Sequence, residues 1–308
     1  MTNVLSQLPP DPMLERRRLI HERAAATIGR RTLISRIVLG LMALAFVIAL
    51  APLVSLVYSL LARGISSIHW AFLSTLPTQP SLIDQNAIGG IGNAIEGSVV
   101  IDLIAGLIAI PIAVLVGLYL SESSSRLANG LRAVTEIMTG MPSILLGVFA
   151  YEYVVVPMKA FSGLAGIVAL AILMVPVIAK ASEMAFRGVP HTLKEAGLAL
   201  GARSSRVARG VIIPSALPGV VTGVLLSLAR AMGETAPLLL VVGASGNWTW
   251  NPHNQMAALP LLTYLYSGSQ YASQRSAAWG VALVLVFMVM VLNIAGRLVA
   301  ARMRKEKR

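Results

Sequence analysis

The sequence predicts an all-α polytopic membrane protein, and three observations support this: its hydropathy, its scarcity of charge and the places where its charges lie. Of its 308 residues, 56% are hydrophobic and 12% are charged, and the mean hydropathy is +0.77. A soluble domain has about 25% charged residues. This composition excludes an ordinary soluble enzyme, a disordered chain and a nucleic-acid-binding domain. The sequence contains no cysteine, and its four histidines show no ligand spacing, so we expect no metal site.

Six apolar segments reach the length of about 20 residues that a membrane-spanning helix needs. We expect these six transmembrane helices at residues 37–61, 97–120, 132–157, 163–185, 213–243 and 278–298. The fifth is interrupted by Gly233, Glu234 and Pro237. In the third, Met141-Pro142-Ser143 can kink the helix. Such a kink can shape the substrate pathway, but we favour the interpretation as a plain packing kink.

The remaining segments are polar tails and connecting loops. Residues 1–36 form an arginine-rich tail without an apolar core, which is not the pattern of a signal peptide. The first helix and the outer loop 62–96 separate this tail from a core permease region at 97–298. Within that region we expect a cytoplasmic loop at 186–213 and an outer loop at 244–277, and a basic tail, 299–308, follows it.

The basic residues predict which side of the membrane each segment faces. With the N-terminus inside, 21 of the 25 Lys and Arg residues fall in cytoplasmic segments and three fall in outer loops. Cytoplasmic loops of membrane proteins carry such an excess of Lys and Arg. We therefore expect both termini in the cytoplasm, and the net charge of +12 reflects topology rather than a nucleic-acid partner.

The two outer loops contain clustered aromatic residues, including Trp248, Trp250 and Tyr264. Aromatic residues are enriched at membrane interfaces, so they can form an interfacial belt. Loops of this length are also often functional, so a docking surface for an external partner is the alternative.

The cytoplasmic loop predicts a helix–turn–helix on the inner face. Lys194–Leu200 is a good helix former, and Gly201 can end it in a left-handed conformation. A second short helix can start at Ser204-Ser205, whose hydroxyls can cap it, and Pro214 marks the entry to the next membrane helix. The alternative is an ordinary amphipathic surface loop.

This loop resembles the EAA loop of ABC-importer permeases. The matching residues are Glu195-Ala196-Gly197, then Gly201, then Ile212–Pro214; Gly197 stands where the family has a second alanine. The resemblance implies a coupling helix, formed by Glu195, Ala196, Gly197 and Gly201, that inserts into a cytoplasmic ATPase. The sequence has no phosphate-binding Gly-x-x-x-x-Gly-Lys-Ser/Thr loop. We therefore expect that the chain is no enzyme and needs no cofactor, and that a partner ATPase binds ATP and Mg²⁺.

A second candidate site lies inside the fifth span. An arginine near the membrane centre costs roughly 2.5–3.5 kcal/mol, so Arg230 should face the bundle interior and be paired. Glu234 lies one helical turn away and can pair with it, while Gly233 and Pro237 can break the helix. One interpretation is a structural ion pair. The other is a substrate pathway in which Arg230, with Glu234 and Thr235, meets a tetrahedral oxyanion, because a guanidinium donates two parallel hydrogen bonds.

The segment Leu228–Leu239 resembles the phosphate-importer permeases of the PstA type, as do Gly90–Ile95, Gly140–Ile144 and Phe161–Gly166. The resemblance covers residues 87 to 298 and implies a type I ABC-importer permease architecture in a bacterial plasma (inner) membrane. It also implies four kinds of partner: a second permease chain (PstC type), two cytoplasmic ATPase subunits (PstB type), an external phosphate-binding protein (PstS type) and phosphate itself.

The sequence thus predicts a permease subunit that imports inorganic phosphate by alternating access, surrounded by lipid and without a nucleic-acid partner. Two alternatives stay open. The substrate can be another oxyanion, such as sulfate or molybdate, or the chain can be a scaffold that signals phosphate status. The sequence assigns no role to five acidic residues in or near the spans: Glu96, Asp102, Glu136, Glu152 and Glu183.

Overall fold

The computed structural model describes residues 12–78 and 88–305, and within these ranges every regular element is a helix. An isolated bridge joins Pro77 to Gly89. Parts of three predicted segments lie outside the described residues: 1–11 of the N-terminal tail, 79–87 of the first outer loop and 306–308 of the C-terminal tail. The prediction of an all-α membrane protein is confirmed.

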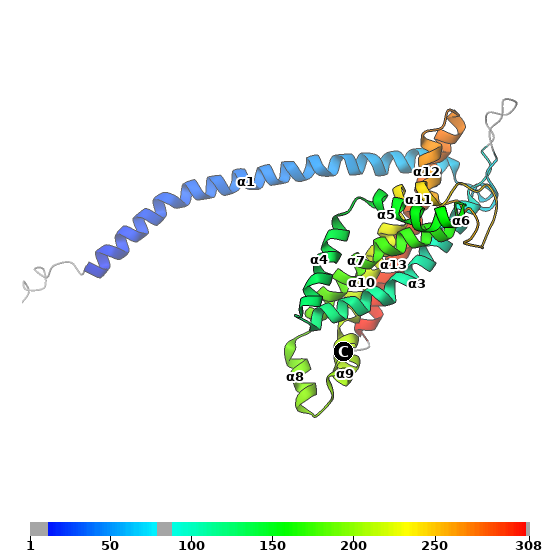
Figure 1. The fold of residues 1–308 in the computed structure, drawn as a ribbon. Coiled ribbons are helices and arrows are strands. Elements are labelled where there is room, and N and C mark those ends of the chain that lie inside the picture. Colours follow the sequence, from blue (N-terminus) through cyan, green and yellow to red (C-terminus); the bar gives the residue numbers. More distant parts are fainter. Residues whose placement is uncertain (1–11, 79–87, 306–308) are drawn as a thin grey trace, which may run out of the picture. The chain divides into compact units, whose positions relative to one another are not determined.

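The first of two compact units ends at Ser59 and, where described, consists of one helix. Helix α1 (Pro12–Gly64) continues from the arginine-rich segment into the first apolar segment without interruption (Figure 1). Its stretch from Arg31 onward is long and apolar enough to cross a membrane. The side chains of residues 31–58 are exposed, which suits a helix whose apolar surface meets lipid.

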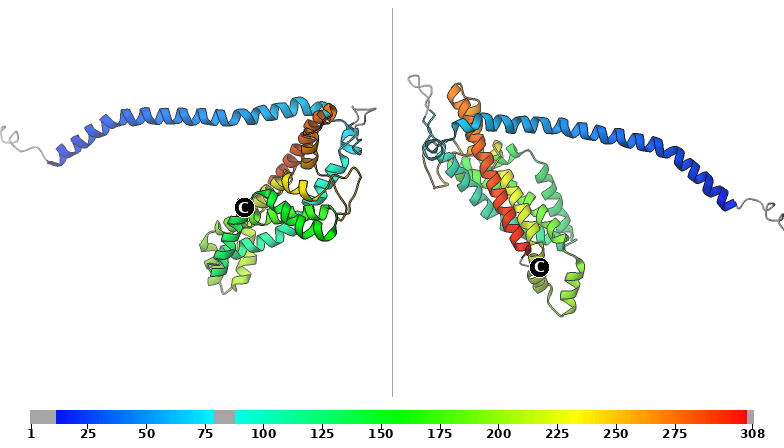
Figure 2. Two further views of the ribbon diagram at one scale, coloured as in Figure 1. Left: turned by 45° about the horizontal axis from the view of Figure 1, so that its top comes forward. Right: turned by 180° about the vertical axis from the view of Figure 1, so that it is seen from behind.

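The second unit, Leu60–Arg308, is built around α7 (Gly163–Arg187). Helices α3 (Gly92–Glu122) and α10 (Ile213–Ala231) pack on α7, and α13 (Ala272–Lys305) packs on α10 (Figure 2). Small residues permit these contacts: a Cβ added to Gly117 would lie 2.7 Å from the carbonyl oxygen of Ala179. In lipid, helices associate mainly by such close packing, because burying apolar surface there brings no gain.

The third predicted span is not one helix. Residues 132–157 fall on α4 (Arg126–Gly140) and on a second segment that contains α5 (Ser143–Ala150), a π-helical turn η3 (Tyr151–Val155) and α6 (Val156–Met158). The two segments meet at an angle of 102°. At Met141-Pro142-Ser143 the structure thus has a break between two helices, where the sequence predicted a kink within one span. Pro142 has no backbone N–H to donate within a helix and, as the N-cap of α5, has a non-helical ψ of 129°; α5 then turns away to pack on α11 (Ala236–Val241).

The described residues contain five helices long enough to span a membrane, or six spans if the bent pair is counted as one. The fifth predicted span, 213–243, is interrupted as expected. Helix α10 ends at Ala231, residues Met232–Thr235 are not helical, and α11 begins at Ala236.

The predicted cytoplasmic loop, 186–213, contains α8 (His191–Ala199) and α9 (Ser204–Val207). The expected helix–turn–helix is present, with two corrections. A π-helical turn, η4 (Ala208–Ile212), joins α9 to α10, so the helix continues from Ser204 to Ala231 and does not begin at Pro214. Arg203 is the N-cap residue of α9 and makes no side-chain capping bond, so the predicted serine caps were wrong.

Short helices occupy the predicted outer loops. They are η2 (Ile65–Ser67), α2 (Trp70–Ser74) and α12 (Leu259–Ser267). A buried apolar cluster holds this end together, and it includes Phe72, Ile91, Leu259 and Val281. The backbone N–H of Leu259 also donates to Ser98 Oγ at 2.8 Å, which ties α12 to α3.

Candidate functional site

The predicted substrate-pathway residues lie at the break between α10 and α11. The N–H groups of Gly233 and Glu234 donate to the carbonyls of Arg230 and Ala231, at 3.1 and 3.0 Å. These tight turns end α10. Pro237 lies in the first turn of α11, where a proline costs no backbone hydrogen bond. Pro237 therefore starts the second helix, and the break itself lies at Met232–Thr235.

The predicted pairing of Arg230 with Glu234 is present in the structure. Arg230 Nε lies 3.5 Å from Glu234 Oε1. The Arg230 side chain is 50% exposed in this chain and that of Glu234 is 18% exposed. Within the described part of the chain, no hydrogen bond occupies the two terminal nitrogens of this guanidinium. Arg230 thus offers two donors on a face that the chain itself leaves open.

Helix α5 packs against α11, the helix that follows this break. A Cβ added to Gly147 would lie 2.7 Å from the Cα of Pro237, so α5 and α11 touch with almost no side chain between them. Gly166 of α7 similarly approaches Val242, which follows α11. Ser143–Ile144 of one resembling segment and Gly163–Gly166 of the other therefore belong to α5 and α7, the helices that pack on α11.

The predicted coupling residues lie on α8 and in the turn after it. Glu195 and Ala196 are exposed, whereas a Cβ on Gly197 would lie 3.0 Å from Val207 Cγ2 of α9. Gly201 has φ +77°, and its N–H donates to the carbonyl of Leu198 at 2.9 Å. This is the left-handed helix end predicted from the sequence.

The α8–α9 region has its own small core and an exposed apolar tip. Val207 and Ile212 pack with Phe186 of α7 in a buried cluster. Leu200, at the end of α8, is 88% exposed. Leu193 and Leu198 of α8 are also exposed, at 45% and 43%, and several exposed apolar side chains on one short helix suit contact with another protein.

Sequence reasoning missed a charged cluster at the end of the bundle that carries α8 and α9. Glu183 is 7% exposed, and its Oε1 lies 2.9 Å from both Arg132 Nε of α4 and Arg187 Nη2 of α7. Both guanidinium groups also donate to the carbonyl of Leu120 near the end of α3, at 3.0 and 3.3 Å. We refer to these residues as the Glu183 cluster. The only sequence signal for it was the pair Glu183 and Arg187, one helical turn apart.

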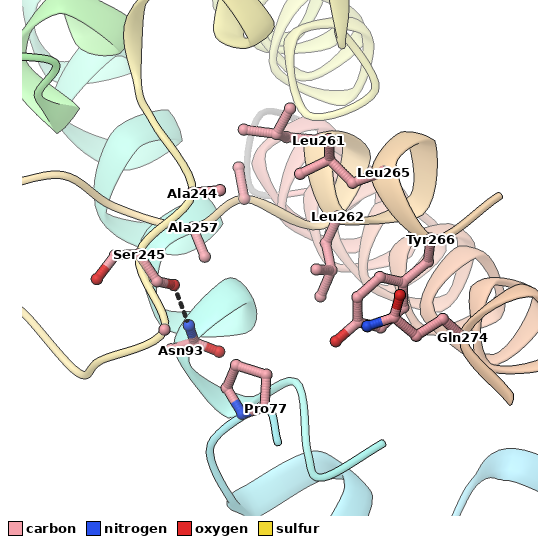
Figure 3. A pocket seen from close by; sticks show the side chains of 12 residues that line it. Pro77, Asn93, Ala244, Ser245, Ala257, Leu261, Leu262, Leu265, Tyr266 and Gln274 are labelled. Atoms are coloured by element: carbon pink, nitrogen blue, oxygen red, sulfur yellow. Dashed lines mark hydrogen bonds between the residues drawn. The ribbon is translucent and has the colours of Figure 1, made fainter. Parts of the chain in front are cut away.

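A pocket of about 210 Å³ lies at the start of α3 and beside α12. Asn93, 3% exposed, donates from Nδ2 to the carbonyl of Ser245 at 2.6 Å (Figure 3), and among the described residues its Oδ1 has no hydrogen-bond partner. Tyr266 and Gln274 lie across the pocket (Figure 3). Burial raises the pKa of Tyr266 above its usual range, so its hydroxyl stays protonated.

The other acidic residues fall into two groups. Glu96 and Asp102 of α3 are buried, and Asp102 Oδ1 has no hydrogen-bond partner among the described residues. Glu136 and Glu152 are exposed in this chain. Among all the acidic residues that the sequence left without a role, the structure places Glu183 in an ion-pair network.

Comparison with known proteins agrees with this architecture. Residues 109–305 match the family described as "Binding-protein-dependent transport system inner membrane component". The chain is 34% identical over 270 residues to the phosphate transport system permease protein PstA of Yersinia pestis, covering 87% of this chain and 90% of that protein. It is 35% identical to the protein of the same name from Haemophilus influenzae, covering 86% and 93%. A solved structure of the MetNI methionine ABC transporter is similar with a TM-score of 0.58 and 25% identity, covering 68% of this chain and 94% of that one.

Proposed function

Because the chain belongs to the family of inner membrane components of binding-protein-dependent transport systems, we propose that it is a permease subunit of an ATP-driven importer of inorganic phosphate. Members of this family are multi-pass membrane permeases and are not enzymes themselves. The observation that carries the phosphate proposal is the similarity to phosphate permeases over 87% of the chain, together with an arginine exposed at a helix break.

In this proposal, Arg230 meets phosphate on the face that the chain leaves open. Its two unoccupied nitrogens suit two oxygens of a tetrahedral anion, since a guanidinium fork matches phosphate geometry. Glu234 would hold the guanidinium from its Nε side, and Thr235 would add a hydroxyl. Gly233 would let the backbone turn there, and Pro237 would start the helix that follows.

A permease of this family works with an ATPase and a binding protein. We propose that these are of the PstB and PstS types, that two ATPase copies bind ATP and Mg²⁺, and that a PstC-type chain completes the pathway opposite Arg230. Helix α8, with Glu195, Ala196, Gly197 and Gly201, would insert into the ATPase. The exposed Leu200 supports this placement, because it would be covered there.

Another oxyanion remains the alternative substrate. The similar MetNI structure belongs to a methionine transporter, so this fold serves chemically different cargoes and does not determine the substrate. A phosphate-status scaffold is the alternative from another class. Such a scaffold would still need α8 to contact the ATPase, but its signalling function would not depend on Arg230.

The test is radiolabelled phosphate uptake at micromolar concentrations in cells that lack this chain. We expect the wild-type chain to restore uptake, and a large excess of sulfate or molybdate to leave it unchanged. Competition by either anion would point to that anion as the substrate. Absence of phosphate uptake, with normal membrane levels of the chain, would favour the scaffold.

We also propose that both termini lie in the cytoplasm of a bacterium and that the chain sits in its plasma (inner) membrane. The excess of Lys and Arg in the predicted inner segments supports this orientation. Alkaline phosphatase is active only outside the cytoplasm. Fused after Arg308 it should be inactive, and inserted after Gly246 it should be active; the reverse pattern would overturn the topology.

A further inference from the structure

Helix α8 is joined to α3 by an ion pair that none of the recognised motifs contains. Lys194 Nζ donates to Glu122 Oε2, across 72 positions of the sequence. Glu122 is the last residue of α3, and Lys194 directly precedes the Glu195-Ala196-Gly197 motif. The two side chains are 36% and 32% exposed. An ion pair this exposed contributes little to overall stability, so its loss should leave the fold intact.

The pair bridges α8 and α3 at the edge of a cavity. This cavity has a volume of about 410 Å³. Ser121 and Glu122 line it from the end of α3, and His191 and Lys194 line it from α8. The second attachment of α8 is the contact of Gly197 with Val207, which leads through η4 into α10 and towards Arg230. Helix α8 therefore has one connection to α10 and a separate, ionic connection to α3.

The C-terminal end of α3, which carries Glu122, is also bonded to α4 and α7. Leu120, two residues before Glu122, accepts hydrogen bonds from Arg132 of α4 and Arg187 of α7. The same two arginines bind Glu183. A displacement applied at Glu122 would thus act on the ends of α3, α4 and α7 together.

We propose that Lys194 and Glu122 are positioning residues that pass the movement of α8 to the cytoplasmic end of α3. This rests on the proposed importer function, in which α8 follows the ATPase. Without the ion pair, the ATPase would still bind α8 and hydrolyse ATP, but α3 would no longer follow. The predicted signature is uncoupling: substrate transported per ATP falls while ATP hydrolysis persists.

The experiment uses the complete transporter in proteoliposomes, with phosphate transport and ATP hydrolysis measured on the same sample. Lys194→Glu and Glu122→Lys each place two like charges together. We expect each to lower the transport-to-ATP ratio about tenfold, within the usual range of coupling between sites. The double variant Glu122→Lys with Lys194→Glu restores an ion pair with the two charges exchanged. We expect its transport-to-ATP ratio to return most of the way to the wild-type value.

Arg126→Glu is the matched control. Arg126 is exposed at the start of α4, forms no ion pair with a described residue, and undergoes the same change of charge. It should keep the wild-type ratio. If a charge reversal prevents insertion, the neutral variants Lys194→Gln and Glu122→Gln remove the pair without repulsion and should show the same direction of change.

Two results would overturn the proposal. One is a wild-type ratio in the single variants. The other is an equal loss of transport and ATP hydrolysis that the double variant does not recover, since that result would mean that Lys194 only docks the ATPase. Failure of the proposed function looks different, because the wild-type transporter itself would then move no phosphate. The variants would in that case be compared on transport of whichever oxyanion the wild type moves.

Discussion

Arg230 Nε lies 3.5 Å from Glu234 Oε1, and the two residues lie on either side of the point where α10 ends. The pair therefore connects the last turn of a membrane helix to the non-helical segment before α11. Any change in that segment would move the guanidinium. The geometry is compatible with both interpretations drawn from the sequence. As a structural ion pair it can order the break, and as part of a substrate pathway it leaves the two terminal nitrogens of Arg230 available for an anion.

Arg230→Gln should strongly reduce phosphate uptake. It removes a charged donor, and the loss of about 1.5–3 kcal/mol expected for a hydrogen bond to a charged group corresponds to about ten- to a hundredfold in uptake. Arg230→Lys keeps the charge but loses the fork and should be intermediate. Uptake is measured in cells with membrane levels checked by immunoblot. Equal uptake by wild type and Arg230→Gln would reduce Arg230 to a structural role.

Gly147→Ala should destabilise the transporter. The added Cβ would lie 2.7 Å from the Cα of Pro237, and overpacking of this kind costs about 1–3 kcal/mol. Thermal unfolding of the purified complex in detergent measures it. Gly130→Ala is the control, because a Cβ there meets nothing within 4 Å and alanine is a better helix former. An unchanged melting temperature for Gly147→Ala would show that α5 and α11 are not in close contact.

Gly201 should tolerate asparagine better than alanine. Its φ of +77° is disfavoured for side chains by roughly 1–2 kcal/mol, and asparagine adopts such angles more readily. No neighbouring atom lies within 4 Å of a Cβ built at this position. Co-purification of the ATPase with the permease measures the effect on α8, and we expect the order glycine, asparagine, alanine. If the two variants behave alike, the left-handed turn does not govern ATPase binding.

Glu183→Gln should lower stability. It leaves the guanidinium groups of Arg132 and Arg187 close together without a neutralising carboxylate, and breaking a buried ionic group of this kind costs roughly 3–5 kcal/mol. Partial exposure of the arginines places the expected value at the lower end. The melting temperature is compared with that of Glu136→Gln, an exposed acid on α4. Equal values for both variants would contradict a structural role for the Glu183 cluster.

The features that the sequence predicted depend on interactions within a few turns of helix. Long apolar segments predict spans, because a membrane leaves the backbone few other choices. Gly201 predicts a helix end from its own conformational freedom, and Arg230 and Glu234 predict a pair from their spacing of one turn. The interruption of the fifth span follows from residues inside the interrupted segment.

The features that the sequence did not reveal depend on distant contacts. Pro142 predicts a disturbance in the third span, but the angle of 102° depends on where α5 packs, and its contact at Pro237 is far along the chain. Arg132 and Glu183 are 51 positions apart, and Glu122 and Lys194 are 72 positions apart. No local pattern predicts that such residues meet. The apolar cluster that joins α9 and η4 to α7 and α10 likewise brings together residues that are distant in the sequence, Phe186 and Val207.

The most direct test of phosphate import is made with the purified transporter in proteoliposomes. Radiolabelled phosphate is followed from the side of the external binding protein, with ATP supplied to the ATPase. The account predicts phosphate accumulation that requires ATP, requires this chain and is lost in Arg230→Gln. ATP hydrolysis that responds to the binding protein but moves no phosphate, or phosphate movement that needs no ATP, would contradict it.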